Sequence, residues 1–326
     1  MSPAAYVYRA SGHLRPLLGG ANVSFGLPSV LTASASAQVI ASAGMIYGVS
    51  AGSETNAKVT AQIASVHPNA YFIYLNGATW AEKVPTTIPA TSDVFVVFMQ
   101  TDATQLDTYL DSMPATRAGR VYVMYRQEPE NDAAYVTNPA LYRAEGSALY
   151  AAVDRQRARG RGAYIVKSSC LMPFYGFKKT DATHPAPIGF QQDWIIPGAE
   201  HIGFSIYAEF KAAGSSVIWG NDPVVYADRA GACCAAIGLP WGASAWGFAL
   251  PDAQMTDPTS LANRVFWFNE NRAALARNGA THANWFNIRF ATSTFQGDYT
   301  LEATTGLYAA WKQALAESGQ YSGPWP

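Results

Sequence analysis

The chain has 326 residues, of which 49% are hydrophobic and 14% are charged, against about 25% charge in an average soluble domain. Its 22 basic and 23 acidic residues leave a net charge of −1 and form no basic cluster. A nucleic-acid binder needs such a cluster, so we expect no DNA or RNA partner. The length suits one large α/β barrel as well as two ordinary domains.

Segments for export or membrane insertion are not recognisable in the sequence. The first 20 residues have no long apolar stretch, and no run of about 18 uncharged apolar residues follows. We therefore expect no secretory signal, no membrane partner, and a cytoplasmic location if the protein acts in a cell. Cys170, Cys233 and Cys234 lack the number for a disulfide framework and the spacing for zinc, so we expect them to pack as small apolar side chains.

Short apolar runs alternate with stretches of helical periodicity, which is typical of a parallel sheet with helices outside it. We predict strands at residues 21–25, 70–75, 93–99, 120–126, 163–169, 201–206, 240–246 and 284–289. We predict helices at residues 53–66, 104–112, 139–159, 222–236, 258–277 and 301–318. This order predicts an α/β protein, a single (β/α)8 TIM barrel over residues 21–326 with an N-terminal extension at residues 1–20.

The fourth predicted strand runs directly into a cluster of polar residues, Arg126, Gln127, Glu128 and, after a proline, Glu130. In (β/α)8 enzymes the chemistry lies where strands run into their following loops. Sugar-cleaving barrels need one carboxyl group to protonate the leaving oxygen and a second to act as nucleophile or base. Glu128 is therefore a candidate general acid, and the alternative is that both glutamates begin a solvated loop.

The segment YRQEPEND, residues 125–132, resembles a motif of glycoside hydrolases related to the family 26 mannanase group, within the clan of retaining (β/α)8 glycosidases. Further segments resemble successive strand ends of that group in the same order, namely LNGATW (75–80), VFVVFM (94–99), KSSCLMPFYG (167–176), HIGFSIYAE (201–209) and GLPWGASAWGF (238–248). Barrels of this kind are found in actinobacteria and in minor tail proteins of their bacteriophages.

The resemblance implies roles for matching residues. Glu128 takes the place of the family's acid/base, and Gln127 that of the histidine before it. Tyr207 matches the tyrosine near the nucleophile, whereas Ser205 stands where active relatives often carry aspartate. These two departures accompany a larger one in the seventh strand.

With Gly247 held in register, the resemblance places Ala245 where the nucleophilic glutamate belongs. A retaining mechanism needs two carboxyl groups about 5 to 5.5 Å apart, and alanine can neither attack the sugar nor stabilise its positive charge. Glu209 or Asp222 is then a candidate second carboxylate for an inverting reaction with Glu128. Otherwise the barrel keeps a sugar-binding cleft and has lost its chemistry, because binding needs no second carboxylate.

Aromatic and polar residues at the predicted strand ends are candidates for binding sugar, because rings stack on apolar sugar faces and amides orient hydroxyl groups. The aromatic candidates are Trp80, Tyr125, Phe174, Tyr175, Tyr207, Trp246 and Trp285. The polar candidates are Asn76, Arg126, Gln127 and Asn287. For each residue alone, packing or capping of a loop explains the sequence equally well.

Other kinds of site find less support. The five histidines have no metal-ligand spacing, and neither a P-loop nor a dinucleotide motif is present, so we expect no metal and no cofactor. Gly242–Trp246 reads GASAW, which resembles the nucleophile elbow of serine hydrolases but ends in tryptophan instead of glycine.

The resemblance therefore implies a glycoside-hydrolase-like barrel in a phage minor tail protein, located in the virion, that binds host cell-surface polysaccharide. Other tail proteins are further possible partners. The alternative is an active endoglycosidase that hydrolyses cell-wall or capsular polysaccharide with Glu128 as general acid. A third hypothesis is a structural tail protein that binds no glycan.

Overall fold

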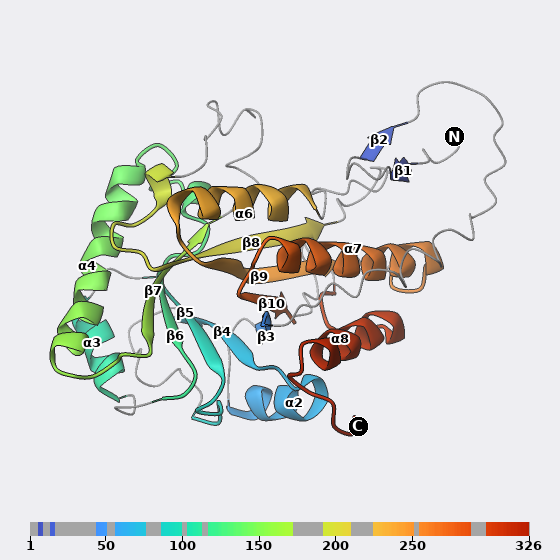
Figure 1. Ribbon diagram of the computed structural model, residues 1–326, viewed down its shortest axis with the longest axis horizontal. Helices are drawn as coiled ribbons and strands as arrows, with labels where there is room; N and C mark the ends of the chain where they lie inside the picture. Colours follow the sequence, from blue (N-terminus) through green and yellow to red (C-terminus); the bar gives the residue numbers. More distant parts are fainter. Residues whose placement is uncertain are drawn as a thin grey trace.

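A computed structural model describes residues 6–8, 14–16, 44–50, 56–75, 86–99, 103–112, 117–171, 192–209, 224–250, 254–287 and 298–325. Eight parallel strands close a barrel in the order β10-β3-β4-β5-β6-β7-β8-β9 (Figure 1). They are β3 (Ile46–Ser50), β4 (Ala70–Leu75), β5 (Asp93–Phe98), β6 (Val121–Tyr125), β7 (Ile165–Leu171), β8 (His201–Glu209), β9 (Trp241–Ala249) and β10 (His282–Phe286). The predicted (β/α)8 barrel is confirmed.

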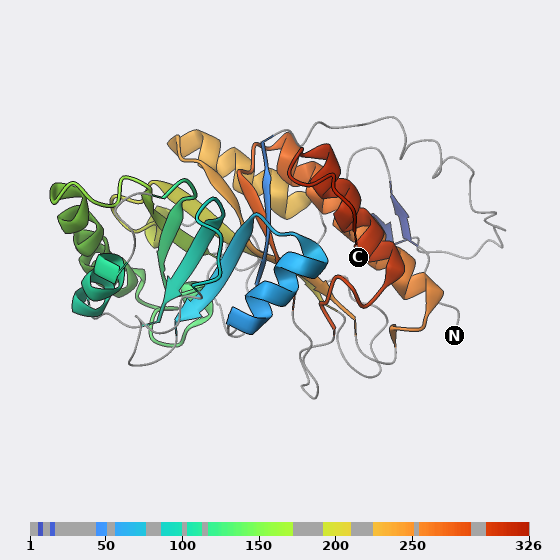
Figure 2. The same cartoon turned by 90° about the horizontal axis from the view of Figure 1, so that it is seen from below.

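The barrel strands are enclosed by helices, as predicted. Those described are α2 (Asn56–Val66), α3 (Ala103–Ser112), α4 (Pro139–Ala158), α6 (Val225–Ile237), α7 (Pro258–Arg277) and α8 (Thr305–Glu317). Figures 1 and 2 show α3 and α4 at one end of the long axis of the molecule, and α7 and α8 toward the other. None of these described helices is long and apolar enough to cross a membrane.

The two longest helices begin at favourable caps. Asn138 and Asp257 each precede a proline in the first turn, and their side chains accept hydrogen bonds from the backbone N–H groups of Leu141 and Ser260 at 3.2 and 2.8 Å. A cap residue satisfies an N–H group that the helix leaves unbonded, and proline suits the first turn because it has no N–H to satisfy. These signals explain why α4 and α7 begin within one residue of prediction.

The first barrel strand was predicted wrongly. Ile46–Ser50 fills the place expected for residues 21–25, which lie outside the described residues, and pairs with both β10 and β4. Its central Gly48 weakens the strand signal in the sequence. The structure requires that glycine, because a Cβ atom there would lie 2.2 Å from Asn284 Oδ1 and 2.6 Å from the Ala70 carbonyl oxygen.

The segment before the barrel is described in part. Strand β1 (Tyr6–Tyr8) pairs antiparallel with β2 (Leu14–Pro16), and both fall within the predicted N-terminal extension. The predicted boundary between residues 20 and 21 lies outside the described residues.

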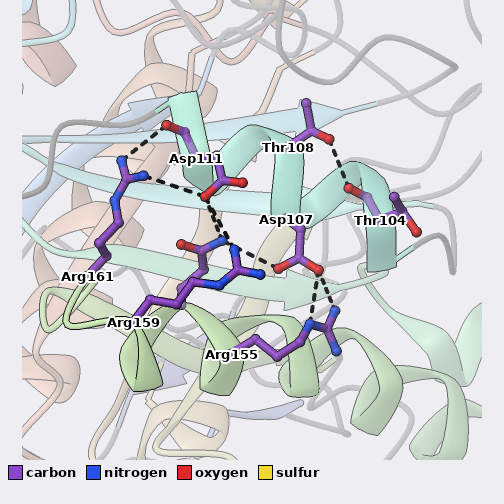
Figure 3. Close-up of polar contacts among 8 residues, drawn as sticks. Thr104, Asp107, Thr108, Asp111, Arg155, Arg159 and Arg161 are labelled. Carbon is purple, nitrogen blue, oxygen red and sulfur yellow. Dashed lines mark hydrogen bonds and ion pairs between the residues drawn. The ribbon is translucent and has the colours of Figure 1, made fainter.

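An ion-pair network joins α3 to α4 (Figure 3). Arg155 binds the Asp107 carboxylate, and Arg159 and Arg161 lie 3.8 and 3.5 Å from Asp111 Oδ1. The buried Gln156 donates to the same Asp111 oxygen at 2.9 Å. Exposed ion pairs contribute less than about 1 kcal/mol each, so the network fixes the alignment of the two helices more than it stabilises the fold.

Two buried histidines lie at the amino-terminal ends of β8 and β10. The rings of His201 and His282 lie 4.8 Å apart, and hydrogen bonds join them to Ser168 at 2.8 Å and Ser244 at 3.2 Å. Burial lowers the pKa of His201 to about 3 and holds the pKa of His282 well below its usual value. Both rings are therefore neutral in the folded protein at neutral pH.

We expect the free energy of unfolding to fall as the pH drops below about 6.5. Unfolded histidines bind protons below that pH, whereas His201 stays neutral until about pH 3 and the pKa of His282 also lies well below its usual value, so protonation favours the unfolded chain. Each histidine adds a slope approaching about 1.4 kcal/mol per pH unit within this window. NMR of the native protein should show two histidine rings that do not titrate between about pH 7.5 and 5. Titration of both rings near pH 6.5 would disprove the buried neutral pair.

Candidate functional site

The chain leaves β6 through a loop with two unusual backbone conformations. Arg126 and Glu128 have φ values of 49° and 53°, in the left-handed region that disfavours residues other than glycine by about 1 to 2 kcal/mol each. Hydrogen bonds to both neighbouring strands hold the loop there. The Arg126 N–H donates to the Phe98 carbonyl of β5, and the Glu128 N–H to the Cys170 carbonyl of β7, both at 2.9 Å. Such strain is often found at functional sites.

Gln127 links Glu128 to β8, which lies two strands from β6 around the barrel. Its side-chain amide donates to Glu128 Oε1 at 3.0 Å and to Ser205 Oγ of β8 at 2.9 Å. Gln127 and Glu128, in the loop after β6, therefore meet Ser205, which is the central residue of β8. A carboxylate has about four acceptor positions, which suits the binding of hydroxyl groups.

Two tyrosines lie close enough to Glu128 to feel its charge. Burial raises the pKa of Tyr74 and of Tyr207 well above the usual value, and the negative charge of Glu128 raises both further. Both phenols therefore stay protonated at neutral pH and are able to donate hydrogen bonds. Tyr207 was predicted at this site, whereas Tyr74 was missed, although its alternation with Phe72 along β4 indicates an inward position.

Aromatic rings continue from Tyr207 toward β10. Its ring centroid lies 5.7 Å from that of Phe286 and 6.0 Å from that of Tyr299. Gly247 makes room for this group, because a Cβ atom there would lie 2.8 Å from Tyr299 Cδ1. The three rings form an aromatic group whose member Tyr207 lies near the Glu128 carboxylate, and sequence reasoning found only Tyr207.

Ala245 faces the barrel interior beside this group. It pairs with Ser205 across the β8–β9 ladder, is fully buried, and packs in the interior cluster that also holds Cys170 and, at its margin, Tyr207. A bulge precedes this pair, where β9 carries the additional residue Ser244. No residue of β9 carries a carboxylate, so the strand that supplies the nucleophile in the resemblance supplies none here.

Trp246 and Trp285 lie on the other side of the barrel wall. Both are fully buried, with ring centroids 5.1 Å apart, and the Trp246 ring stacks at 4.9 Å on Phe268 of α7. Neighbouring residues of a strand face opposite sides, so the inward position of Ala245 sends Trp246 outward. These tryptophans pack the barrel against a helix, which corrects the prediction that they bind sugar.

The remaining candidates are divided between other contacts and undescribed positions. Arg126 pairs with Asp132 at 3.1 Å and is a quarter exposed, with 27% of its side chain accessible. Asn287 accepts the Leu301 N–H, and Tyr125 packs outside the barrel in the core beneath α4. The positions outside the described residues are Asn76, Trp80, Phe174, Tyr175 and Asp222. Glu209 is the last residue of β8, and its side chain is not among those described.

In the described part of the chain, no group of three or more His, Cys, Asp and Glu side chains lies together in a way that could hold a metal ion.

Several solved structures with a similar fold are glycosidases. A family 128 (subgroup II) endo-β-1,3-glucanase from Sorangium cellulosum matches with a TM-score of 0.51 and 16% identity over 82% of this chain and 97% of that one. A double mutant of an endo-β-1,4-mannanase from Cellulomonas fimi has a TM-score of 0.54 and 10% identity, over 83% and 70%. The catalytic domain of a family 26 endo-β-1,4-mannanase from a Bacillus species has 0.52 and 11%, over 86% and 89%.

These likenesses show that the chain shares a (β/α)8 barrel fold with these glycosidases, as the sequence resemblance implied. At such low identity they concern the fold alone. No protein-family model matches the sequence, and no curated protein matches it.

The reactivity of the three cysteines measures how well each thiol is enclosed in the folded protein. Burial raises the pKa of Cys170 well above its usual value and that of Cys234 to about 12, and both are buried, whereas Cys233 is partly exposed. We expect a thiol reagent to modify Cys233 in the native protein and the other two after denaturation, because modification needs an accessible thiolate. In the variant Cys233→Ser, fast native modification of Cys170 would contradict its enclosed position.

Proposed function

We propose that this chain is a glycoside-hydrolase-like barrel that binds polysaccharide around Glu128 and does not cleave it. The observation that carries the proposal is the inward, buried position of Ala245 beside Ser205. The resemblance assigns a nucleophilic glutamate to this position. An alanine methyl group has no electron pair to attack a sugar and no charge to stabilise an oxocarbenium ion, so the retaining reaction lacks one of its two groups.

The groups around Glu128 suit the binding of a glycan. Gln127 orients the Glu128 carboxylate and the Ser205 hydroxyl, and both kinds of oxygen exchange hydrogen bonds with sugar hydroxyls. Tyr207 adds an aromatic surface and a neutral phenol to the same place. Stacking and hydrogen bonding do not depend on a matched pair of titrating groups, so the loss of a nucleophile leaves binding possible.

We further propose that the protein acts in a phage tail, where it binds host cell-surface polysaccharide in the company of other tail proteins. The support for this setting is the resemblance of YRQEPEND and the strand-end segments to barrels that occur in minor tail proteins. Detection of the chain in purified virions by mass spectrometry tests the proposal, and its absence from virions would overturn it.

An active endoglycosidase is the second candidate function. Glu209 favours it, because this residue ends β8 only two positions after Tyr207, at the same end of the barrel as Glu128. An inverting reaction uses two carboxyl groups about 6.5 to 9.5 Å apart, so Glu128 would act as general acid and Glu209 or Asp222 as base.

Hydrolysis and binding by matched variants separate the two candidates. We expect the wild type to bind at least one polysaccharide from a panel of mannans, glucans and host cell-wall glycans without releasing products. Glu128→Gln should weaken that binding about tenfold, since a hydrogen bond to a charged group contributes roughly 1.5 to 3 kcal/mol. The control is Glu317→Gln at the far end of α8, where the carboxylate pairs with Arg272.

The variant Ala245→Glu adds the carboxylate that the resemblance places in β9. Product analysis by chromatography follows each variant over the same panel. Turnover by Ala245→Glu alone would support a barrel that lost its nucleophile. Wild-type turnover that Glu128→Gln abolishes would overturn the binding proposal and establish the endoglycosidase.

A further inference from the structure

The Glu145 carboxylate of α4 accepts hydrogen bonds from two buried tyrosines at the ends of the loop that carries Glu128. The hydroxyl groups of Tyr125 and Tyr135 each donate to Glu145 Oε2 at 2.6 Å, and their oxygens lie 2.9 Å apart. Tyr125 is the last residue of β6, and Tyr135 comes after the short helix η2 (Pro129–Asn131). The two ends of the loop are thus tied to a single oxygen atom.

Arg126 is held between these ends. Its guanidinium lies 5.3 Å from the ring centroid of Tyr135 and 5.9 Å from that of Tyr125, and it pairs with Asp132 at 3.1 Å. Asp132 in turn accepts the Ala134 N–H at 2.9 Å, next to Tyr135. The side chain of Arg126 is therefore directed toward the two tyrosines and Asp132, while Gln127 extends to Ser205 on β8.

The helix that carries Glu145 is itself fixed in place. One turn before Glu145, the Tyr142 hydroxyl donates to the Tyr125 carbonyl at 3.1 Å. Toward the other end of α4, Arg155 and Arg159 join the ion-pair network with α3 (Figure 3). Glu145 thus joins the loop to a helix whose own position is fixed.

We propose that Glu145 is a positioning residue for the Glu128 site. By accepting both phenols, its carboxylate holds Arg126 and Glu128 in their left-handed conformations and keeps the Glu128 carboxylate in contact with the Gln127 amide. This role rests on the proposed function in so far as Glu128 is the group that binds the glycan. Glu145 itself touches the two tyrosines and acts through them.

A carboxylate is suited to this task by its chemistry. Burial raises the pKa of both Tyr125 and Tyr135, so each phenol keeps its proton and donates it at neutral pH. A carboxylate oxygen accepts two such bonds, and bonds to a charged acceptor are shorter and stronger than neutral ones. An amide oxygen also accepts two bonds but more weakly, whereas alanine accepts none. Glu145→Gln should therefore weaken the two hydrogen bonds, and Glu145→Ala should remove them.

The experiment follows the side-chain amide signals of Gln127 by NMR, assigned through their loss in Gln127→Leu. We expect Glu145→Ala and Tyr135→Phe to move these signals toward their positions in Glu128→Ala, and Glu145→Gln to restore most of the wild-type position. The control, Asp154→Ala, removes a carboxylate of the same helix that pairs with Lys167 and does not contact the loop, so it should leave the signals unchanged.

Glycan affinity is the second readout. Glu145→Ala should weaken binding about tenfold, and Asp154→Ala less than about twofold. Unchanged Gln127 signals in Glu145→Ala or Tyr135→Phe, or an equal change in Asp154→Ala, would overturn the positioning role. If Glu145→Ala does not fold, Tyr135→Phe and Glu145→Gln decide the question. If the wild type binds no glycan of the panel, the proposed function fails while the amide signals still judge the role of Glu145.

Discussion

Closure of eight parallel strands into a barrel forces each strand to turn alternate side chains inward and outward. Along β9 this rule decides the chemistry, because a bulge precedes Ala245 and leaves its methyl group inside, next to Ser205. The same step sends Trp246 into the layer against α7. A register one residue different would exchange the two, so the absence of a β9 carboxylate and the aromatic packing outside the barrel have one origin.

The loop after β6 shows how the barrel supports a strained site. Left-handed conformations at Arg126 and Glu128 persist because backbone hydrogen bonds tie the loop to the ends of β5 and β7, and because Glu145 holds its tyrosines from outside. Such a rigid arrangement suits a site that binds glycan through a pre-positioned carboxylate, since little order remains to be imposed on binding. It does not by itself supply a second carboxylate, which agrees with the proposed binding of a glycan without hydrolysis.

Much of the fold, and the centre of the candidate site, could be predicted from hydrophobic periodicity and from the motifs at the strand ends. Buried apolar strands such as Asp93–Phe98 are visible because both faces are covered, and YRQEPEND located Glu128 and Gln127. Ile46–Ser50 was missed because Gly48, which the approach of Asn284 requires, interrupts its apolar run. Trp246 was misassigned because a bulge changes which residues face inward, and Glu145 was missed because contacts between distant segments leave no local signal.

The central claim is that Glu128 binds a sugar with no second carboxylate in position for hydrolysis. A crystal structure with a bound oligosaccharide measures this directly, through the distance from the Glu128 carboxyl group to the nearest carboxyl group across a glycosidic bond. The account predicts a sugar in contact with Glu128 and Tyr207, and Ala245 on the far side of the bond. A carboxyl group of Glu209 or Asp222 across that bond, about 5 to 9.5 Å from Glu128, would contradict it, because that spacing serves hydrolysis.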